Sequence, residues 1–330
     1  KTNGRRREPI GGTIRRKLQL MNFDVESRTI LLTRSGSHAY GTNIESSDED
    51  FKGLCVPPKK YVLSPFFNFE QQERLVSKGH PSDTTIFSLN KFLKLAADCN
   101  PNIIEVLYVE PEDVISATPE GRLLIENRDL FLSKKAKFTF SGYAHSQLRR
   151  IKSHRSWLMD PPKGKPTRQE FGLNEGHSVS RNDLGAIKAL EERGYDLNLQ
   201  SLLQREKEYD KAMSNWKSYE GWKKNRNPAR AELEAKYQFD CKHGSHLIRL
   251  SRMAVEILET GTVHTRRPDA EELRAIRLGE WSYDRLVEES EALMAKSEEL
   301  YKTSPLKKSA DIKKIADLGI SLHETYWSKN

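Results

Sequence analysis

A small-residue turn between an apolar run and an acidic segment constrains this chain more than any other feature. The apolar run Ile30–Leu32 is followed by the turn Gly36-Ser37, and two aspartates, Asp48 and Asp50, then precede a segment that can continue as a strand. Glycine and serine let backbone amides come close to an anion such as a nucleotide phosphate. The order of these parts predicts a phosphate site inside a mixed α/β region.

The two aspartates are expected to project from one face of that strand. Side chains alternate between faces, so Asp48 and Asp50 point the same way and Glu49 points away. Two like charges on one face repel each other unless a cation lies between them, and oxygen-rich pairs suit Mg²⁺. The pair therefore predicts a metal-dependent phosphate site. The alternative is a charged turn after an edge strand.

The longer pattern carries a family resemblance. The sequence G-S-H-A-Y-G-T at residues 36–42, followed by S-D-E-D-F-K-G at residues 47–53, resembles the nucleotidyltransferase signature of the DNA polymerase beta superfamily. Its form is most similar to predicted nucleotidyltransferases found beside RNA ligases in RNA-repair gene neighbourhoods, with phage-encoded relatives. The resemblance covers residues 30–110 well and residues 137–150 and 236–285 moderately, and it does not inform residues 155–230.

The resemblance implies Mg²⁺-dependent transfer of a nucleoside monophosphate from an NTP to a hydroxyl, with release of pyrophosphate. Two-metal phosphoryl transfer generally needs a third carboxylate on a neighbouring strand, and Asp83, which opens the predicted strand 84–88, fits that place. Asp48, Asp50 and Asp83 would then be the catalytic and metal-binding residues, with Mn²⁺ as a substitute ion. Gly36 and Ser37 would cradle the β and γ phosphates. The alternative for Asp83 is a turn residue.

A second region of resemblance is helical. Lys242, His246 and Arg249 fall at i, i+4 and i+7, which places them on one stripe of a helix beside apolar residues. In related nucleotidyltransferases a helical domain faces the catalytic sheet and lends cations to the triphosphate. Lys242 and Arg249 would neutralise the pyrophosphate, and His246 would donate a hydrogen bond. The alternative is the solvated edge of an amphipathic helix.

The predicted fold class is α+β, with a small mixed sheet flanked by helices and then a mainly α-helical domain. Glu105 lies among apolar residues of a short predicted helix capped by Asn102, so we expect a buried carboxylate paired with a base or a helix end. Tyr143 and Leu148 are expected to point inward from the helix 138–153. The other helices are predicted at residues 89–97, 183–194, 197–224, 231–258, 282–301 and 311–327, with a long loop at 159–182.

Charge divides the chain into two predicted domains. Residues 1–130, the predicted catalytic domain, hold 18 basic and 18 acidic residues, whereas residues 131–330 hold 37 and 29, and an insertion is predicted near 155–230. The basic half is therefore expected to bind a polyanion, and an RNA end such as that of a damaged tRNA is the expected acceptor. A protein acceptor, or a nucleic-acid-binding protein without catalysis, are the alternatives.

Aromatic residues stand among the lysines of the basic half. Trp216, Tyr219 and Trp222 alternate with Lys217, Lys223 and Lys224, an arrangement that can stack on nucleobases or simply pack helices together. The three cysteines have no paired spacing, so neither a disulfide framework nor a zinc site is expected, and the usage fits a cytoplasmic protein. The mean hydropathy of −0.73 and the lack of a long apolar run predict no membrane span and no secretory signal. No oligomeric state is indicated.

Overall fold

The computed structural model describes residues 23–79, 82–175, 199–226 and 228–330. The chain divides into two compact units: unit 1 is Lys1–Arg149 with Cys241–Asn330, and unit 2 is Arg150–Asp240. The predicted boundary at residue 130 stays a prediction, and the C-terminal segment groups with the N-terminal part in unit 1. Unit 2 covers the segment 155–230 that was expected to be an insertion.

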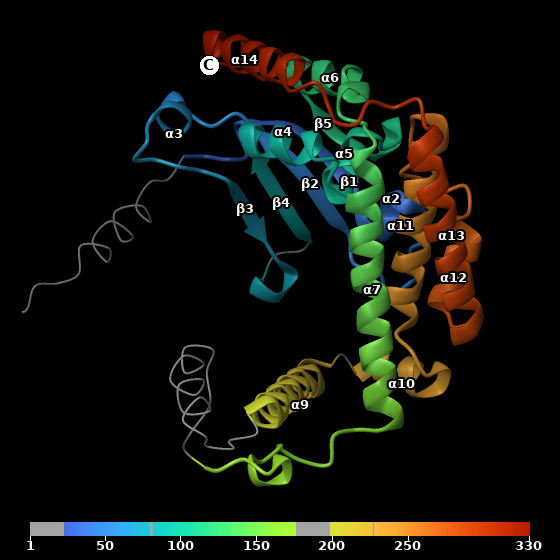
Figure 1. Ribbon diagram of the computed structural model, residues 1–330. Helices are drawn as coiled ribbons and strands as arrows, with labels where there is room; N and C mark the ends of the chain where they lie inside the picture. Colours follow the sequence, from blue (N-terminus) through green and yellow to red (C-terminus); the bar gives the residue numbers. More distant parts are fainter. Residues whose placement is uncertain (1–22, 80–81, 176–198, 227) are drawn as a thin grey trace, which may run out of the picture. The chain divides into compact units, whose positions relative to one another are not determined.

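Unit 1 contains a five-stranded mixed sheet with the strand order β3-β4-β2-β1-β5 (Figure 1). Strands β2 and β4 are parallel, and the other neighbouring pairs are antiparallel. The sheet and the helical C-terminal region confirm the predicted α+β class. The strands are β1 Thr29–Ser35, β2 Asp50–Cys55, β3 Gln71–Arg74, β4 Asp83–Ser88 and β5 Val114–Ala117.

Two helices cover the apolar end of one sheet face. Helix α4 (Leu89–Ala97) follows β4 directly, and its start is capped by Ser88, whose hydroxyl accepts the Lys91 N–H at 3.3 Å. Helix α5 (Pro101–Leu107) is capped by Asn100, not by Asn102 as predicted, because Pro101 occupies the first helical position. Phe92, Ile103, Ile104 and Leu107 are fully buried and form the core on this side.

The helices of unit 1 come from the segments that precede and follow unit 2 in the sequence. Helix α7 (Lys135–Met159) starts in unit 1 and runs into unit 2, and helix α11 (Cys241–Thr260) begins where the chain returns. The single helix expected at 231–258 is broken into α10 (Pro228–Tyr237) and α11, because Gln238 adopts a positive φ of 66°. The remaining helices of unit 1 are α2 Gly36–Tyr40, α3 Lys59–Leu63, α6 Pro119–Glu126, α12 Ala270–Arg277, α13 Tyr283–Thr303 and α14 Ile312–Lys329.

The predicted helices at 138–153, 282–301 and 311–327 are confirmed by α7, α13 and α14. Leu148 is buried as expected, but Tyr143 is 40% exposed, so its predicted inward orientation was wrong. Its hydroxyl accepts a hydrogen bond from the side chain of Asn100 at 3.3 Å at the surface. Tyrosine suits such a place because its ring covers apolar surface while its hydroxyl stays wet.

Unit 2 is built from α7 after Arg150, helix α9 (Leu199–Asn225) and α10. Trp157 is buried, and its ring lies 5.5 Å from that of Trp222 and 6.0 Å from that of Tyr219. Tyr219 and Trp222 therefore pack α9 against α7, which is the second of the two interpretations given for the aromatic residues of this segment. The helix predicted at 183–194 and the last part of the long loop lie outside the described residues.

The cysteines and the helices agree with two expected absences. Cys55, Cys99 and Cys241 are all buried and form no disulfide. Burial raises the pKa of the Cys55 and Cys99 thiols to about 12, so both are inert hydrophobic side chains. Among the described helices, none has an apolar stretch sufficient to cross a bilayer.

Candidate active site

Three polar residues line up across the central strands of the sheet. Ser35 pairs with Asp50 between β1 and β2, and Asp50 pairs with Asp83 between β2 and β4. Directly paired residues point to the same face of a sheet. Ser35, Asp50 and Asp83 therefore form a row on one face, at the end of three adjacent strands. Asp48 lies in the loop before β2 rather than in the strand, which corrects the prediction that both aspartates share one strand.

The same face is apolar at its other end. The pairing continues through Lys52 to Leu54, which has no exposed surface beneath the layer of α4 and α5. Lys52 marks the boundary, where its amine donates to the side-chain oxygen of Asn102 on α5 at 3.3 Å. The helices thus cover the apolar part of this face and leave its acidic end open to a ligand.

Gly36 makes room for the carboxylate of Asp50. Gly36 has a φ of +66°, and a β-carbon built there would lie 3.0 Å from Cγ of Asp50 and would overlap its Oδ2. Only glycine combines this backbone conformation with the missing side chain. Ser37 follows in the first turn of α2, and its backbone carbonyl accepts the Thr42 N–H at 2.9 Å. The predicted phosphate turn, residues 36–42, is therefore in direct contact with Asp50, a predicted metal ligand.

The charges of the other two predicted aspartates affect the carboxylate of Asp50. The pKa of Asp50 is raised, chiefly by burial, and the charges of Asp83 and Asp48 raise it further. The cations Lys52 and Lys242 work in the opposite direction. Asp83 is the strand partner of Asp50, and the charge of Asp48 reaches the same carboxylate. Carboxylates that share one site and repel each other form the environment that a divalent cation stabilises.

Local hydrogen bonds hold the two outer aspartates. Oδ1 of Asp83 accepts the Val76 N–H at 2.7 Å, which fixes the start of β4. The loop that carries Asp48 is tied to α2, because Nε2 of His38 lies 3.2 Å from the carbonyl oxygen of Ser47. His38 stands inside the phosphate turn, so it serves as a positioning residue for this loop.

Arginines of α12 hold the end of the phosphate turn. Arg274 donates to the carbonyl oxygen of Gly41 at 2.9 Å, and Arg277 donates to that of Thr42 at 3.2 Å. Cations at the C-terminal end of a helix such as α2 are favourable, because carbonyl groups point out of it. The sequence did not predict α12 or these contacts, since more than 200 residues separate the arginines from the turn.

The three cationic residues predicted on a helix lie near the start of α11. The charge of Lys242 lowers the pKa of Asp50, so Lys242 lies within electrostatic range of that carboxylate. The pKa of His246 is held well below its usual range, first by burial and then by the charges of Arg249 and Lys242, with His243 and Arg277 adding to them. His246 is thus neutral at pH 7 and lies in a field that favours an anion.

Arg249 is buried rather than part of a solvated helix edge. It is 5% exposed, forms an ion pair with Glu105, and lies with its guanidinium 3.8 Å from the centre of the Tyr40 ring. The Tyr40 hydroxyl donates to the other oxygen of Glu105 at 2.5 Å. The predicted pairing of Glu105 with a base is confirmed. Arg249 therefore joins α11 to α5 and to the end of the phosphate turn.

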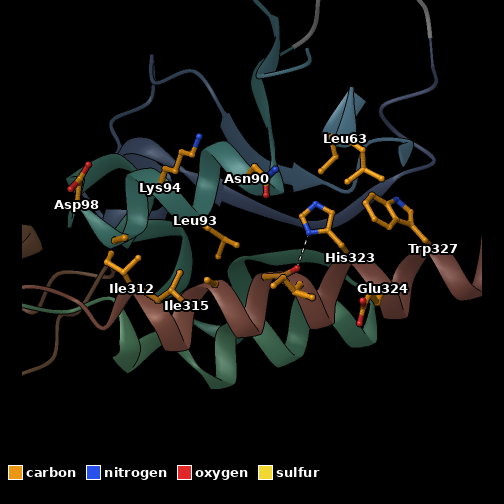
Figure 2. A pocket seen from close by; sticks show the side chains of 15 residues that line it. Leu63, Asn90, Leu93, Lys94, Asp98, Ile312, Ile315, His323, Glu324 and Trp327 are labelled. Atoms are coloured by element: carbon orange, nitrogen blue, oxygen red, sulfur yellow. Dashed lines mark hydrogen bonds between the residues drawn. The ribbon is translucent and has the colours of Figure 1, made fainter. Parts of the chain in front are cut away.

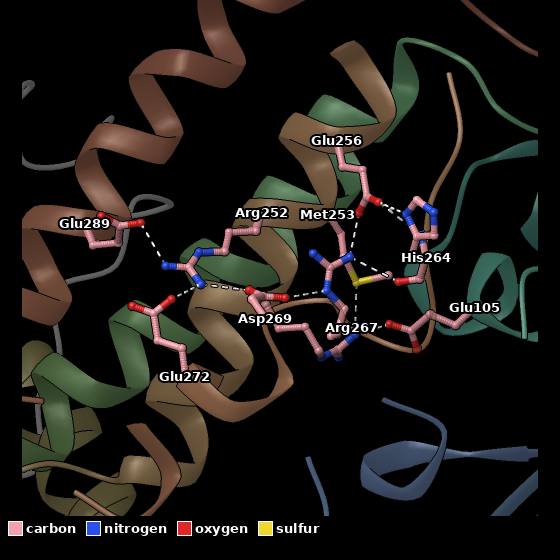
Figure 3. A network of polar contacts seen from close by, with 10 residues as sticks. Glu105, Arg252, Met253, Glu256, His264, Arg267, Asp269, Glu272 and Glu289 are labelled. Atoms are coloured by element: carbon pink, nitrogen blue, oxygen red, sulfur yellow. Dashed lines mark hydrogen bonds and ion pairs between the residues drawn. The ribbon is translucent and has the colours of Figure 1, made fainter. Parts of the chain in front are cut away.

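A second ionic network connects helices α11, α12 and α13 of unit 1 (Figure 3). Arg252 bonds Asp269 at 2.7 Å, Glu272 at 2.6 Å and Glu289 at 3.2 Å, which connects α11 with α12 and α13. Burial alone would raise the pKa of Asp269, but the hydrogen bond from Arg252 and the charge of Arg267 lower it. Because α12 carries the arginines that hold the phosphate turn, this network also supports the site.

A large groove lies elsewhere in unit 1. It encloses about 710 Å³ between α4 and α14 and is mainly apolar, with Leu93, Ile315 and Trp327 among its lining residues (Figure 2). His323 points into it and is 6% exposed, and its Nδ1 bonds the carbonyl oxygen of Gly319 at 2.7 Å. None of the three predicted aspartates lines this groove, so it is not the candidate active site.

Part of the chain matches a known protein family and a phage protein. Residues 10–159 match the family described as "RNA repair pathway DNA polymerase beta family", which confirms the resemblance for that part of the chain. A 129-residue stretch is 32% identical to "Uncharacterized 38.9 kDa protein in nrdC-mobD intergenic region" of Enterobacteria phage T4. That stretch is 36% of this chain and spans 38% of the phage protein. No solved structure matches the chain.

Proposed function

We propose that this protein is a Mg²⁺-dependent nucleotidyltransferase that transfers a nucleoside monophosphate from an NTP to a hydroxyl of an RNA end. The observation that carries the proposal is the row Ser35, Asp50 and Asp83, with Asp48 close by, in a part of the chain that matches a polymerase-beta family. The phosphate turn in contact with Asp50 adds the second half of such a site.

The donor set fits a divalent cation. Asp48, Asp50 and Asp83 offer only carboxylate oxygens, the ligands that Mg²⁺ prefers, and burial, followed by the charges of Asp83 and Asp48, raises the pKa of Asp50. Mn²⁺ takes the same ligands and is the expected substitute. When bound, the metal supplies charge neutralisation at the triphosphate and lowers the pKa of the acceptor hydroxyl.

The chain's own residues account for the remaining steps. The acceptor oxygen forms a bond to the α-phosphorus, the bond from that phosphorus to the bridging oxygen breaks, and pyrophosphate leaves with the electron pair. Asp83 would take the proton of the acceptor hydroxyl. Backbone amides at Gly36 and Ser37 would bind the β and γ phosphates. Lys242 and the neutral His246 would contact the leaving pyrophosphate. The positive charge of the buried Arg249 would stabilise the pyrophosphate from a greater distance.

Two observations support RNA as the acceptor. The matching family is described as part of an RNA repair pathway. Residues 134–230 hold 21 basic and 11 acidic residues, and a surplus of this size favours a polyanionic partner. The net positive charge of the chain lies outside residues 1–130, where basic and acidic residues balance. The helical half is therefore the proposed RNA-binding part.

The test is incubation of the protein with each α-³²P NTP, Mg²⁺ and total tRNA. Asp50→Asn keeps the shape of the side chain but removes its charge, and Glu49→Gln, at the adjacent position in the loop before β2, is the matched control. Label on RNA that is lost in Asp50→Asn and kept in Glu49→Gln supports the proposal. Label on polypeptide alone would show that the acceptor is a protein, and no label with either acceptor would overturn the transferase assignment.

A further inference from the structure

A second group of metal-ligand side chains lies in unit 2, among residues that the proposed transfer does not use. His154 is on α7, Glu234 is on α10, and Asp240 directly precedes α11. One ligand atom from each of these residues lies within 4.8 Å of the other two. Two parts of unit 2 that are distant in sequence, α7 and residues 234–240, thus bring a nitrogen and two carboxylate oxygens to one point.

The burial of the two carboxylates makes this cluster unusual. Glu234 is 3% exposed and Asp240 is 4% exposed, and His154 is half-buried. Buried carboxylates are costly unless cations compensate them, and two that share one site repel each other. Arg226 supplies one positive charge, through contacts from Nε at 2.8 Å and Nη2 at 2.7 Å. A divalent cation is the kind of ion that stabilises two buried carboxylates at one point.

Neighbouring side chains fix the orientation of the ligands. The ring of His154 stacks on that of Trp157 at 5.5 Å and 27°, and lies 5.5 Å from the ring of Trp222. Both contacts of Arg226 go to Oε2 of Glu234, and its guanidinium lies 4.5 Å from the centre of the Trp222 ring. Outer contacts of this kind are what orient the ligands in protein metal sites.

We propose that His154, Glu234 and Asp240 bind a divalent transition-metal ion of the Zn²⁺ type. One imidazole and two carboxylates match the three protein ligands of an open zinc site, in which water takes the fourth position. The imidazole disfavours Mg²⁺ and Ca²⁺, which prefer oxygen. The ion joins α7 to α10 and to Asp240, and it therefore stabilises unit 2.

Sequence patterns could not have found this site. His154 and Glu234 belong to different helices, and the spacing resembles no compact zinc motif. The lack of paired cysteine spacing does not count against this metal site, because none of its three ligands is a cysteine.

The experiment is a Zn²⁺ titration of the full chain after chelator treatment, in excess Mg²⁺ so that the oxygen-only site is occupied. We expect wild-type protein to bind one Zn²⁺ in this background, with a rise in Tm. His154→Gln and Asp240→Asn should each weaken binding by about 10-fold or more. His145→Gln is the matched control, because His145 is an exposed histidine on the same helix.

Equal affinity in all four proteins, or no binding by the wild type, would overturn the proposal. A second measurement covers the case in which a variant fails to fold. Co²⁺ added to the wild-type protein should give a visible absorption band of a nitrogen- and oxygen-ligated ion, and added Zn²⁺ should remove it. An absent band under the same conditions counts against the site.

Discussion

The carboxylate of Asp50 lies directly against the α-carbon of Gly36, with no space for a β-carbon between them. This contact joins the two halves of the polymerase-beta signature, the small turn and the aspartates, into one structural unit. Substitution of the glycine therefore changes the proposed metal site as well as the turn.

We expect Gly36→Ala to abolish most of the transfer activity. The new methyl group would displace the carboxylate, and misplacement of a catalytic group by about 1 Å typically costs on the order of 100-fold in rate. The positive φ adds about 1 kcal/mol or more of strain. Gly142→Ala is the control, because Gly142 lies in α7 with open space around it. Full activity of Gly36→Ala would contradict the site.

The pair formed by Arg249 and Glu105 allows a structural role to be separated from a catalytic one. Arg249→Leu leaves a buried carboxylate without its cation and should cost about 3–5 kcal/mol in urea unfolding. Arg249→Leu with Glu105→Leu should recover much of that stability. We expect the double variant to remain slow in nucleotidyl transfer. A double variant that is both stable and fully active would show that Arg249 serves the fold alone.

Arg274 should affect transfer through the phosphate turn. Arg274→Met removes the hydrogen bond to the carbonyl oxygen of Gly41, and a bond from a charged donor is worth about 1.5–3 kcal/mol. We expect weaker NTP binding, measured by titration, and a lower rate. Arg285→Met on α13, where the side chain is largely exposed, is the control. Unchanged NTP affinity in Arg274→Met would remove α12 from the site.

The stability of the protein should fall as the pH drops below about 6.5, the pKa of histidine in an unfolded chain. Burial lowers the pKa of His323, so the unfolded state binds more protons in this window and is favoured as the pH falls. Nε2 of His323 is buried without a partner among the described residues, which leaves no acceptor for a second proton. Tm measured at a series of pH values should vary less in His323→Gln than in wild type.

His246 contributes to the same pH dependence with the same sign, since its pKa is also lowered by burial. The slope in His323→Gln should therefore be reduced rather than abolished. His145→Gln, at an exposed position, should leave the slope unchanged. A wild-type slope in His323→Gln would show that its burial does not affect stability.

RNA binding by the basic half should depend steeply on salt. Lys217, Lys223 and Lys224 are exposed on α9, and each lysine that contacts a phosphate contributes about one unit to the slope of log K against log salt. The triple glutamine variant should have a shallower slope for tRNA. A matched triple variant of Lys308, Lys313 and Lys314, exposed in unit 1, is the control. Equal slopes would place the RNA elsewhere.

Local rules predicted the central parts of the fold. The family resemblance, together with side-chain alternation, indicated Asp50 and Asp83, which the structure pairs across β2 and β4. The same rules failed for Asp48, because the strand begins two residues later than the pattern suggested. Strand β3 was missed because its sequence Gln-Gln-Glu-Arg is polar, which an edge strand tolerates.

What could not be predicted depends on contacts between distant segments. The apolar neighbours of Glu105 predicted that it would be buried and paired, but its partner Arg249 is 144 residues away. The arginines of α12 and the cluster in unit 2 have no local signal for the same reason. Pattern reasoning finds residues within one element, whereas these sites arise from the packing of several.

The discontinuity of unit 1 has a consequence for the order of synthesis. A ribosome completes the sheet and the whole of unit 2 before it makes α11, so the partner of Glu105 emerges late. Until then the nascent chain carries its acidic row without the helix that brings Lys242 beside it. A chain released at residue 240 would contain the entire signature motif and still lack this cation, so the motif alone is no evidence of a competent enzyme.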